Sequence, residues 1–326
     1  MITRHFSIKI RKYLSILILI VFGFWATIYI RENSSAFTAI TNIPALSIVT
    51  LFIICFGILV CNGLILKHIL RIFKIDSSFK EWMSITIIST AFNFITPFKG
   101  GAGFRALYLK RVHQFDLIYF ISTFSVMFLV QAFVNSVIGI LCFSFFLLKS
   151  TPVRPIIGLW FILIIIVSLF ILRMNFKFKK SHKFPINYIV SILNGFAILR
   201  KSPSEYRLLI IYTSLYSLLS ILHFKITFYS IGINMSWVAV SFYSATQNVA
   251  ALIPLTPGGL GVLEAISIYI SQSLSYSTSE ALMVQGLTRC VFLSLVFFLT
   301  PFCMRYLTLS SSSIIKKSRD KDDMSI

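Results

Sequence analysis

Long apolar runs recur along almost the whole chain, separated by short polar segments. Five of them have about 17 to 25 residues, enough at about 1.5 Å per helical residue to cross the hydrocarbon core of a bilayer. They lie near 13–30, 44–66, 156–172, 207–231 and 281–304. A sixth run, Leu117 to Leu148, is longer than an upright crossing needs, so it must tilt, bend or begin in the interface. The pattern predicts an all-α integral membrane protein with about six full transmembrane helices.

Two further apolar stretches, Trp82 to Thr96 and Trp237 to Ile253, run into proline and glycine instead of into charged loops. The first spans only about 22 Å as a helix, which is too short for a full crossing. Basic residues flank it on both sides, among them Lys80 and Lys99. Short basic loops stay in the cytoplasm, so both ends of this segment are expected on one side. We therefore predict two broken, re-entrant hairpins in place of two more spans.

The placement of positive charge predicts the orientation of the chain. With the N-terminus inside, the segment 173–207 and the C-terminus also lie inside, and only Arg31, Lys149 and Arg154 fall outside. The two hairpins then come from opposite leaflets. We predict a bacterial inner-membrane protein with both termini cytoplasmic, in which the segment 13–30 is a retained anchor. A helix from Ile186 to Leu199 lies either on the anionic leaflet or simply connects two spans.

Composition agrees with a membrane location. The chain is 57% hydrophobic and 12% charged, and its mean hydropathy is +0.88, so it has too little polar surface for a soluble globule. The net charge of +20 resides in loops on one predicted side, which argues against a nucleic-acid partner. The domain prediction is a polytopic membrane region over 1–305, followed by a short cytoplasmic tail over 306–326 that we expect to be disordered.

Signatures of soluble enzymes are missing from the sequence. The five cysteines lie inside apolar runs without a CxxC spacing, and no GxxxxGK[ST], HExxH or GxSxG motif occurs. We therefore predict no catalytic residue, no metal site and no cofactor.

The two broken segments resemble each other. Thr96 to Arg105 and Leu255 to Glu264 both contain a proline followed by GGxG, and together they suggest inverted repeats centred on 93–111 and 251–265. A broken helix frees backbone N–H groups, which suit a phosphate or carboxylate. A kink or a small-residue packing face is the alternative. The residues concerned are Pro97, Gly100, Gly101, Gly103, Pro257, Gly258, Gly259 and Gly261.

Charged residues near membrane depth are costly, so they usually have a partner or a purpose. Arg105 and Glu264 lie just beyond the glycine clusters, where the arginine is suited to hold a phosphate and the glutamate to pair with an arginine or carry a proton. Arg289 lies deep in its span, whereas Lys225 lies near a span end and can snorkel. We therefore rank Arg289 above Lys225. His223, Asn93, Gln247 and Asn248 are secondary candidates.

Two segments carry a family resemblance: NFITPFKGGAGFRALYLKR, from Asn93 to Arg111, and ALIPLTPGGLGVLEA, from Ala251 to Ala265. They resemble the flippase-like family that includes the transmembrane region of lysylphosphatidylglycerol synthases, and the resemblance spans about residues 13 to 305. It implies a membrane part that translocates a charged phospholipid, without the soluble aminoacyl-transferring domain. Where several branches of the family carry a glutamate after Gly101, this chain has Ala102.

Three functions follow as hypotheses. The first is a translocator that moves an anionic phospholipid or a lipid-linked saccharide across the inner membrane, with membrane lipids as its partners. The second is a membrane-embedded lipid-modifying enzyme in which Glu264 acts as general base. The third is a non-catalytic scaffold that recruits a partner enzyme of a glycolipid or polysaccharide pathway through its basic loop and tail.

Overall fold

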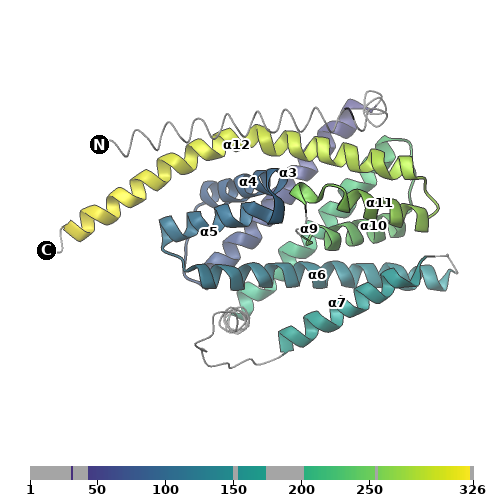
Figure 1. Cartoon of the computed structure of the whole chain (residues 1–326), viewed down its shortest axis with the longest axis horizontal. Helices are drawn as coiled ribbons and strands as arrows, with labels where there is room; N and C mark the ends of the chain where they lie inside the picture. Colours follow the sequence, from purple (N-terminus) through teal and green to yellow (C-terminus); the bar gives the residue numbers. More distant parts are fainter. Residues whose placement is uncertain (1–30, 32–42, 150–152, 174–201, 254–255, 324–326) are drawn as a thin grey trace.

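The computed structural model describes residues 31, 43–149, 153–173, 202–253 and 256–323 (Figure 1). All regular structure in this part of the chain is helical. Four helical stretches are long and apolar enough to cross a membrane: α3 (Ala45–Ile72), Tyr119–Leu148 of α6 (Leu117–Leu148), α9 (Pro203–Ser230), and Thr278–Leu309 of α12 (Thr278–Asp323). The described part of the chain is thus all-helical, and the chain is a multi-pass membrane protein.

The predicted spans agree closely with these helices where the structure describes them. The long run from Leu117 to Leu148 forms one helix, α6, with those same ends. The run near 156–172 forms α7 (Pro155–Arg173), an apolar helix that is shorter than the four spans. The predicted span at 13–30 and the predicted helix at 186–199 lie outside the described residues. The layout of six full spans therefore stays a prediction.

Both predicted breaks occur where the sequence placed them. The first hairpin consists of α4 (Phe79–Ile95), the 3-10 turn η1 (Pro97–Lys99) and α5 (Gly100–His113). The second consists of α10 (Trp237–Ala250), the 3-10 turn η2 (Pro257–Gly259) and α11 (Val262–Ser273). Ser78 and Ser236 cap α4 and α10 by accepting hydrogen bonds from backbone N–H groups three residues later.

The tips of the two hairpins meet. Figure 1 shows α4 and α5 on one side and α10 and α11 on the other, with α12 along one edge and α6 along the opposite edge. The turns η1 and η2 contact each other, and η2 also contacts α4. The frame around them is formed by α3 against α9, α12 against α4, and α6 against α10. This arrangement places the two breaks against each other.

Each hairpin has its own apolar core. Trp82, Ile85, Ile88 and Leu109 are buried around the first, and Phe228, Phe242 and Tyr243 are buried around the second. Glycines let aromatic rings approach neighbouring helices: a Cβ on Gly63 would lie 2.3 Å from the ring of Trp82. Close packing of this kind stabilises helices in lipid, where the hydrophobic effect does not drive helix association.

The C-terminal tail differs from the expectation. The backbone of α12 is helical as far as Asp323, so it includes most of the segment that we expected to be disordered. A helix that is already nucleated extends at little cost through lysine, arginine and serine, which explains the difference.

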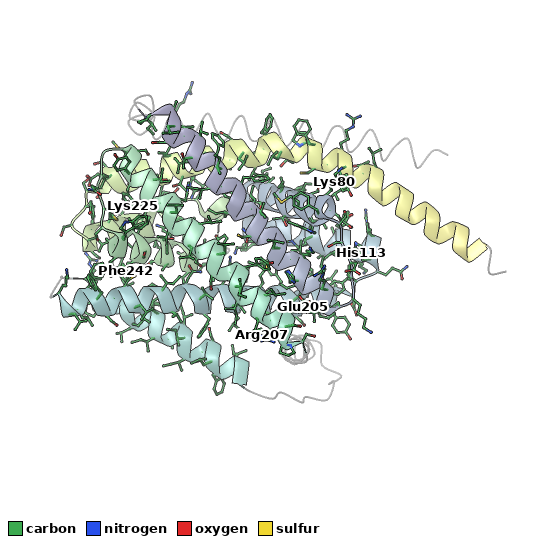
Figure 2. The ribbon with its side chains drawn as sticks, turned by 180° about the vertical axis from the view of Figure 1, so that it is seen from behind. Lys80, His113, Glu205, Arg207, Lys225 and Phe242 are labelled. Carbon is green, nitrogen blue, oxygen red and sulfur yellow. The ribbon has the colours of Figure 1, made fainter. Side chains whose placement is uncertain are left out.

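Several charged side chains gather towards one end of the molecule. Figure 2 shows Lys80, His113, Glu205 and Arg207 towards one end, with Lys225 and Phe242 towards the other. At the first end, His113 Nε2 lies 2.8 Å from Glu81 Oε1, and His68 Nδ1 lies 2.6 Å from Glu205 Oε2. This end carries residues predicted to be cytoplasmic, and which side of the membrane it occupies stays a prediction.

Candidate functional site

The two breaks have the same backbone course, counted from their prolines. Thr96 and Thr256 are extended (φ −110° and −122°), and Pro97 and Pro257 then begin the turns. The next residues, Phe98 and Gly258, have φ of 54° and 55°. Lys99 and Gly259 follow, at 52° and 70°. The structure therefore matches Pro97 with Pro257, which supports two related repeats.

This match corrects the register taken from the GGxG letters. Gly258 and Gly259 correspond to Phe98 and Lys99, not to Gly100 and Gly101. The cause is a difference in length: α5 begins directly after its turn, whereas Leu260 and Gly261 lie between η2 and α11. Glycine relieves the left-handed backbone only in the second hairpin, because Phe98 and Lys99 adopt it with side chains.

The glycines of the first hairpin serve close packing. A Cβ on Gly101 would lie 1.7 Å from the carbonyl oxygen of Ser89, and a Cβ on Gly100 would lie 2.2 Å from Thr96 Oγ1. A Cβ on Gly103 meets nothing within 4 Å. The alternative of a small-residue packing face therefore holds for Gly100 and Gly101.

Both helix N-termini beyond the breaks are capped by side chains. The N–H of Gly101 donates to Asn93 Oδ1 over 3.0 Å, and the N–H of Gly261 donates to Glu264 Oε2 over 2.8 Å. Each of them is one of the backbone N–H groups that we expect to face a ligand. One such donor at each break therefore already has an acceptor within the chain.

Glu264 has an arginine partner, and that partner is Arg289 instead of Arg105. Arg289 Nε lies 2.7 Å from Glu264 Oε1. The angle at the N–H of Arg289 Nε is too far from linear for a hydrogen bond to Glu264 Oε1, so charge attraction holds this pair. Arg289 Nη1 also donates to the carbonyl oxygen of Gly258 over 3.0 Å. Arg289 thereby fastens α12 to the tip of the second hairpin.

Arg105 and Lys99 are cations without a carboxylate partner among the described residues. Arg105 is buried, its Nη2 donates to Ser89 Oγ over 2.9 Å, and its Nε has no hydrogen-bond partner in the same part of the chain. Lys99 is half-buried, and its Nζ lies 4.1 Å from the centre of the Phe128 ring. Lys225 differs, because its Nζ donates to Asn234 Oδ1 and the carbonyl oxygen of Met235 near the end of α9.

A cavity of about 320 Å³ lies where the hairpin tips meet. Its lining includes four residues of the main predicted set, Arg105, Gly258, Gly259 and Arg289. All four secondary candidates, Asn93, His223, Gln247 and Asn248, line it as well. Pro97, Gly100, Gly101, Gly103, Pro257, Gly261 and Glu264 do not line it. These residues shape the two breaks that border the cavity.

Sequence reasoning missed Lys99 as a cavity residue. It was read only as one of the basic residues that flank the first hairpin. The available signal was its position inside the break, two residues after Pro97, where the chain cannot continue as a regular helix. Polar residues from other helices also line the cavity, notably Gln131 of α6 and Ser220 of α9.

A family model, lysylphosphatidylglycerol synthase TM region, matches residues 12–300. The chain belongs to this family. The matched residues include both hairpins. The resemblance drawn from the two motifs is thereby confirmed. A search of curated proteins and a search of solved structures each returned no match.

Proposed function

We propose that this chain translocates lipids with an anionic headgroup across the bacterial inner membrane, with both of its termini in the cytoplasm. The observation that carries the proposal is the pair of cations, Lys99 and Arg105, that line an interior cavity without a carboxylate partner among the described residues. Charges at membrane depth are expensive, so they mark substrate pathways when no internal partner neutralises them.

An anionic headgroup supplies the missing partner. At an effective dielectric constant of about 20, a phosphate at about 4 Å from one cation gains about 4 kcal/mol before desolvation is subtracted. Arginine adds directed hydrogen bonds to phosphate oxygens, and Arg105 Nε is free of other partners in the described part of the chain. The nearby phenylalanines Phe94, Phe124, Phe128 and Phe292 offer apolar surface for the start of the acyl chains.

The position of the cavity favours alternating access. In transporters built from inverted repeats, broken helices meet at a central site that opens to one side and then to the other. The two hairpins here have equivalent turns, and η1 contacts η2 beside the cavity. A small movement of either hairpin relative to the other would change which end of the cavity is open.

The enzyme hypothesis receives less support. Glu264, its general base, is in an ion pair with Arg289, accepts a hydrogen bond from the N–H of Gly261, and does not line the cavity. We therefore propose transport without chemical change of the lipid. A partner enzyme that supplies or consumes the lipid remains part of the proposal.

The test uses purified full-length protein in liposomes with phosphatidylglycerol labelled on an acyl chain with a nitrobenzoxadiazole group. Dithionite quenches only the outer-leaflet label, so protein-dependent translocation raises the quenched fraction. Lys99→Gln should slow this movement by about tenfold, which corresponds to about 1.4 kcal/mol of lost stabilisation. Lys225→Gln removes the same charge outside the cavity and should match the wild type. Equal rates in vesicles with and without protein would reject translocation and favour the scaffold.

A further inference from the structure

The cavity has a second set of polar groups, and these are uncharged. Gln131, Ser220, Gln247 and Asn248 line it from α6, α9 and α10. Two hydrogen bonds fix the side chain of Asn248. Its Nδ2 donates to Asn135 Oδ1 over 3.0 Å, and its Oδ1 accepts from Ser220 Oγ. A fixed amide with a hydroxyl beside it is suited to hydrogen-bond another hydroxyl group.

Several buried polar atoms that have no hydrogen-bond partner among the described residues belong to side chains of this cavity. They are Arg105 Nε, His223 Nε2, Gln247 Oε1, Thr288 Oγ1 and Arg289 Nη2. Buried polar atoms are rarely left unsatisfied, so a cluster of them around one cavity indicates an absent polar occupant. The two guanidinium atoms donate to an anion. Gln247 Oε1 requires a donor, and a hydroxyl provides one.

No carboxylate lines the cavity in the part of the chain that the structure describes. Glu264, which follows the cavity residue Leu263, does not line the cavity and is already paired with Arg289. Of the aromatic rings that line the cavity, Phe128 already has the ammonium of Lys99 over its face. A headgroup with its own ammonium would therefore meet like charges from Lys99 and Arg105 with no negative partner, an arrangement that discriminates strongly between ligands.

We propose that the cavity selects lipids whose phosphate carries an uncharged, hydroxylated substituent, such as glycerol or a sugar, and rejects lipids whose headgroup carries an ammonium group. This inference rests on the proposed function, because it names the headgroup that the translocator takes. The phosphate lies against Arg105 and Lys99, and the hydroxyl groups lie against Gln247 and the amides beside it. Selectivity then arises because Lys99 and Arg105 attract the phosphate and repel an ammonium group attached to it, while no carboxylate among the described lining residues offsets that repulsion.

The test compares matched lipids, all labelled on the acyl chain, in the same proteoliposomes. Phosphatidylglycerol and phosphatidylinositol should move. Lysylphosphatidylglycerol, which adds ammonium groups to the same glycerol, and phosphatidylethanolamine should move about tenfold more slowly or less. Phosphatidylmethanol keeps the negative charge but lacks hydroxyl groups, and it should be slower than phosphatidylglycerol. Equal rates for phosphatidylglycerol and phosphatidylethanolamine would overturn the selectivity while leaving translocation established.

Two substitutions change the selectivity in opposite ways. Gln247→Leu removes the free amide oxygen, so it should slow phosphatidylglycerol and leave phosphatidylmethanol unchanged. Gln131→Glu places a carboxylate in the cavity, so it should raise the rate of phosphatidylethanolamine relative to phosphatidylglycerol by at least about tenfold. A lipid preference unchanged in both folded variants would contradict the assignment of the cavity.

Lipid retention by the detergent-purified protein, measured by native mass spectrometry, separates selection from movement. Preferential retention of phosphatidylglycerol over phosphatidylethanolamine, without any movement in liposomes, would reject the proposed function and support the selection. Equal retention of the two lipids would reject the selection whatever the transport result.

Discussion

The substitution Gly101→Ala, compared with Gly103→Ala, separates packing from ligand binding at the first break. Both glycines lie on α5, two residues apart, and both belong to the GGxG motif. A Cβ at position 101 would lie 1.7 Å from the carbonyl oxygen of Ser89, whereas a Cβ at position 103 meets nothing within 4 Å. Because backbone atoms do not approach this closely, α5 would have to move away from α4 by about 1 Å or more.

Overpacking of this kind costs about 1–3 kcal/mol. The shift would also strain the hydrogen bond from the N–H of Gly101 to Asn93 and that from Arg105 to Ser89, both of which link α5 to α4. Alanine at position 103 should instead be neutral or stabilise α5 by about 0.5–1 kcal/mol, because glycine is a poor residue inside a helix.

The assay is thermal unfolding of each detergent-purified variant, followed by tryptophan fluorescence, together with its translocation rate. We expect a lower midpoint and slower translocation for Gly101→Ala, and wild-type behaviour or a higher midpoint for Gly103→Ala. If the two variants lose translocation equally and keep equal midpoints, the motif acts as a ligand site and the packing account is wrong.

Three further substitutions test other contacts. Phe98→Gly should stabilise the protein by about 0.5–1 kcal/mol in the same unfolding assay, because the exposed Phe98 has a left-handed φ of 54°, which glycine adopts without strain. A lower unfolding midpoint would contradict this backbone strain. Arg289→Gln leaves Glu264 without its charge partner and should lower the free energy of unfolding by about 3–5 kcal/mol. The double variant with Glu264→Gln should recover part of this loss. If the losses of the two single variants simply add in the double variant, the pair is not coupled. Gly63→Val should lower the midpoint by forcing α3 away from Trp82, and an unchanged midpoint would reject that contact.

Much of the fold follows from the apolar pattern. The ends of α6 were predicted correctly because apolar residues fill the run from Leu117 to Leu148 and polar residues flank it. The breaks at Pro97 and Pro257 were also predicted, since each proline is followed by glycines and the two residue types together disfavour a continuous helix. Pro301, which has no glycine beside it, lies inside α12.

The residue-by-residue match between the two repeats was not predictable from the GGxG motif. GGxG is a pattern of residue types, whereas the backbone course is anchored by the prolines, and Phe98 and Lys99 adopt the conformation that Gly258 and Gly259 adopt in the other hairpin. Side chains in a left-handed backbone are uncommon, so no sequence rule assigns them there in advance.

The candidate site was only partly predictable for a different reason. Arg289 and Arg105 were singled out because a charge inside an apolar run is costly at any position. Their partners depend on which helices pack together: α12 brings Arg289 to Glu264, and α5 brings Arg105 to Ser89. Likewise, Lys99 lines the cavity only because the two hairpin tips meet there.

The central claim is that the unpaired cations between the hairpin tips bind an anionic headgroup during its passage. It is tested most directly by the initial rate of phosphatidylglycerol movement in proteoliposomes that contain the double variant Lys99→Gln with Arg105→Gln, with Lys225→Gln as the matched control. The account predicts protein-dependent movement of phosphatidylglycerol by the wild type and the control. It predicts that the initial rate falls by at least about tenfold in the double variant. The double variant is compared only if it unfolds at a temperature close to that of the wild type. Movement by the folded double variant at the wild-type rate would contradict it.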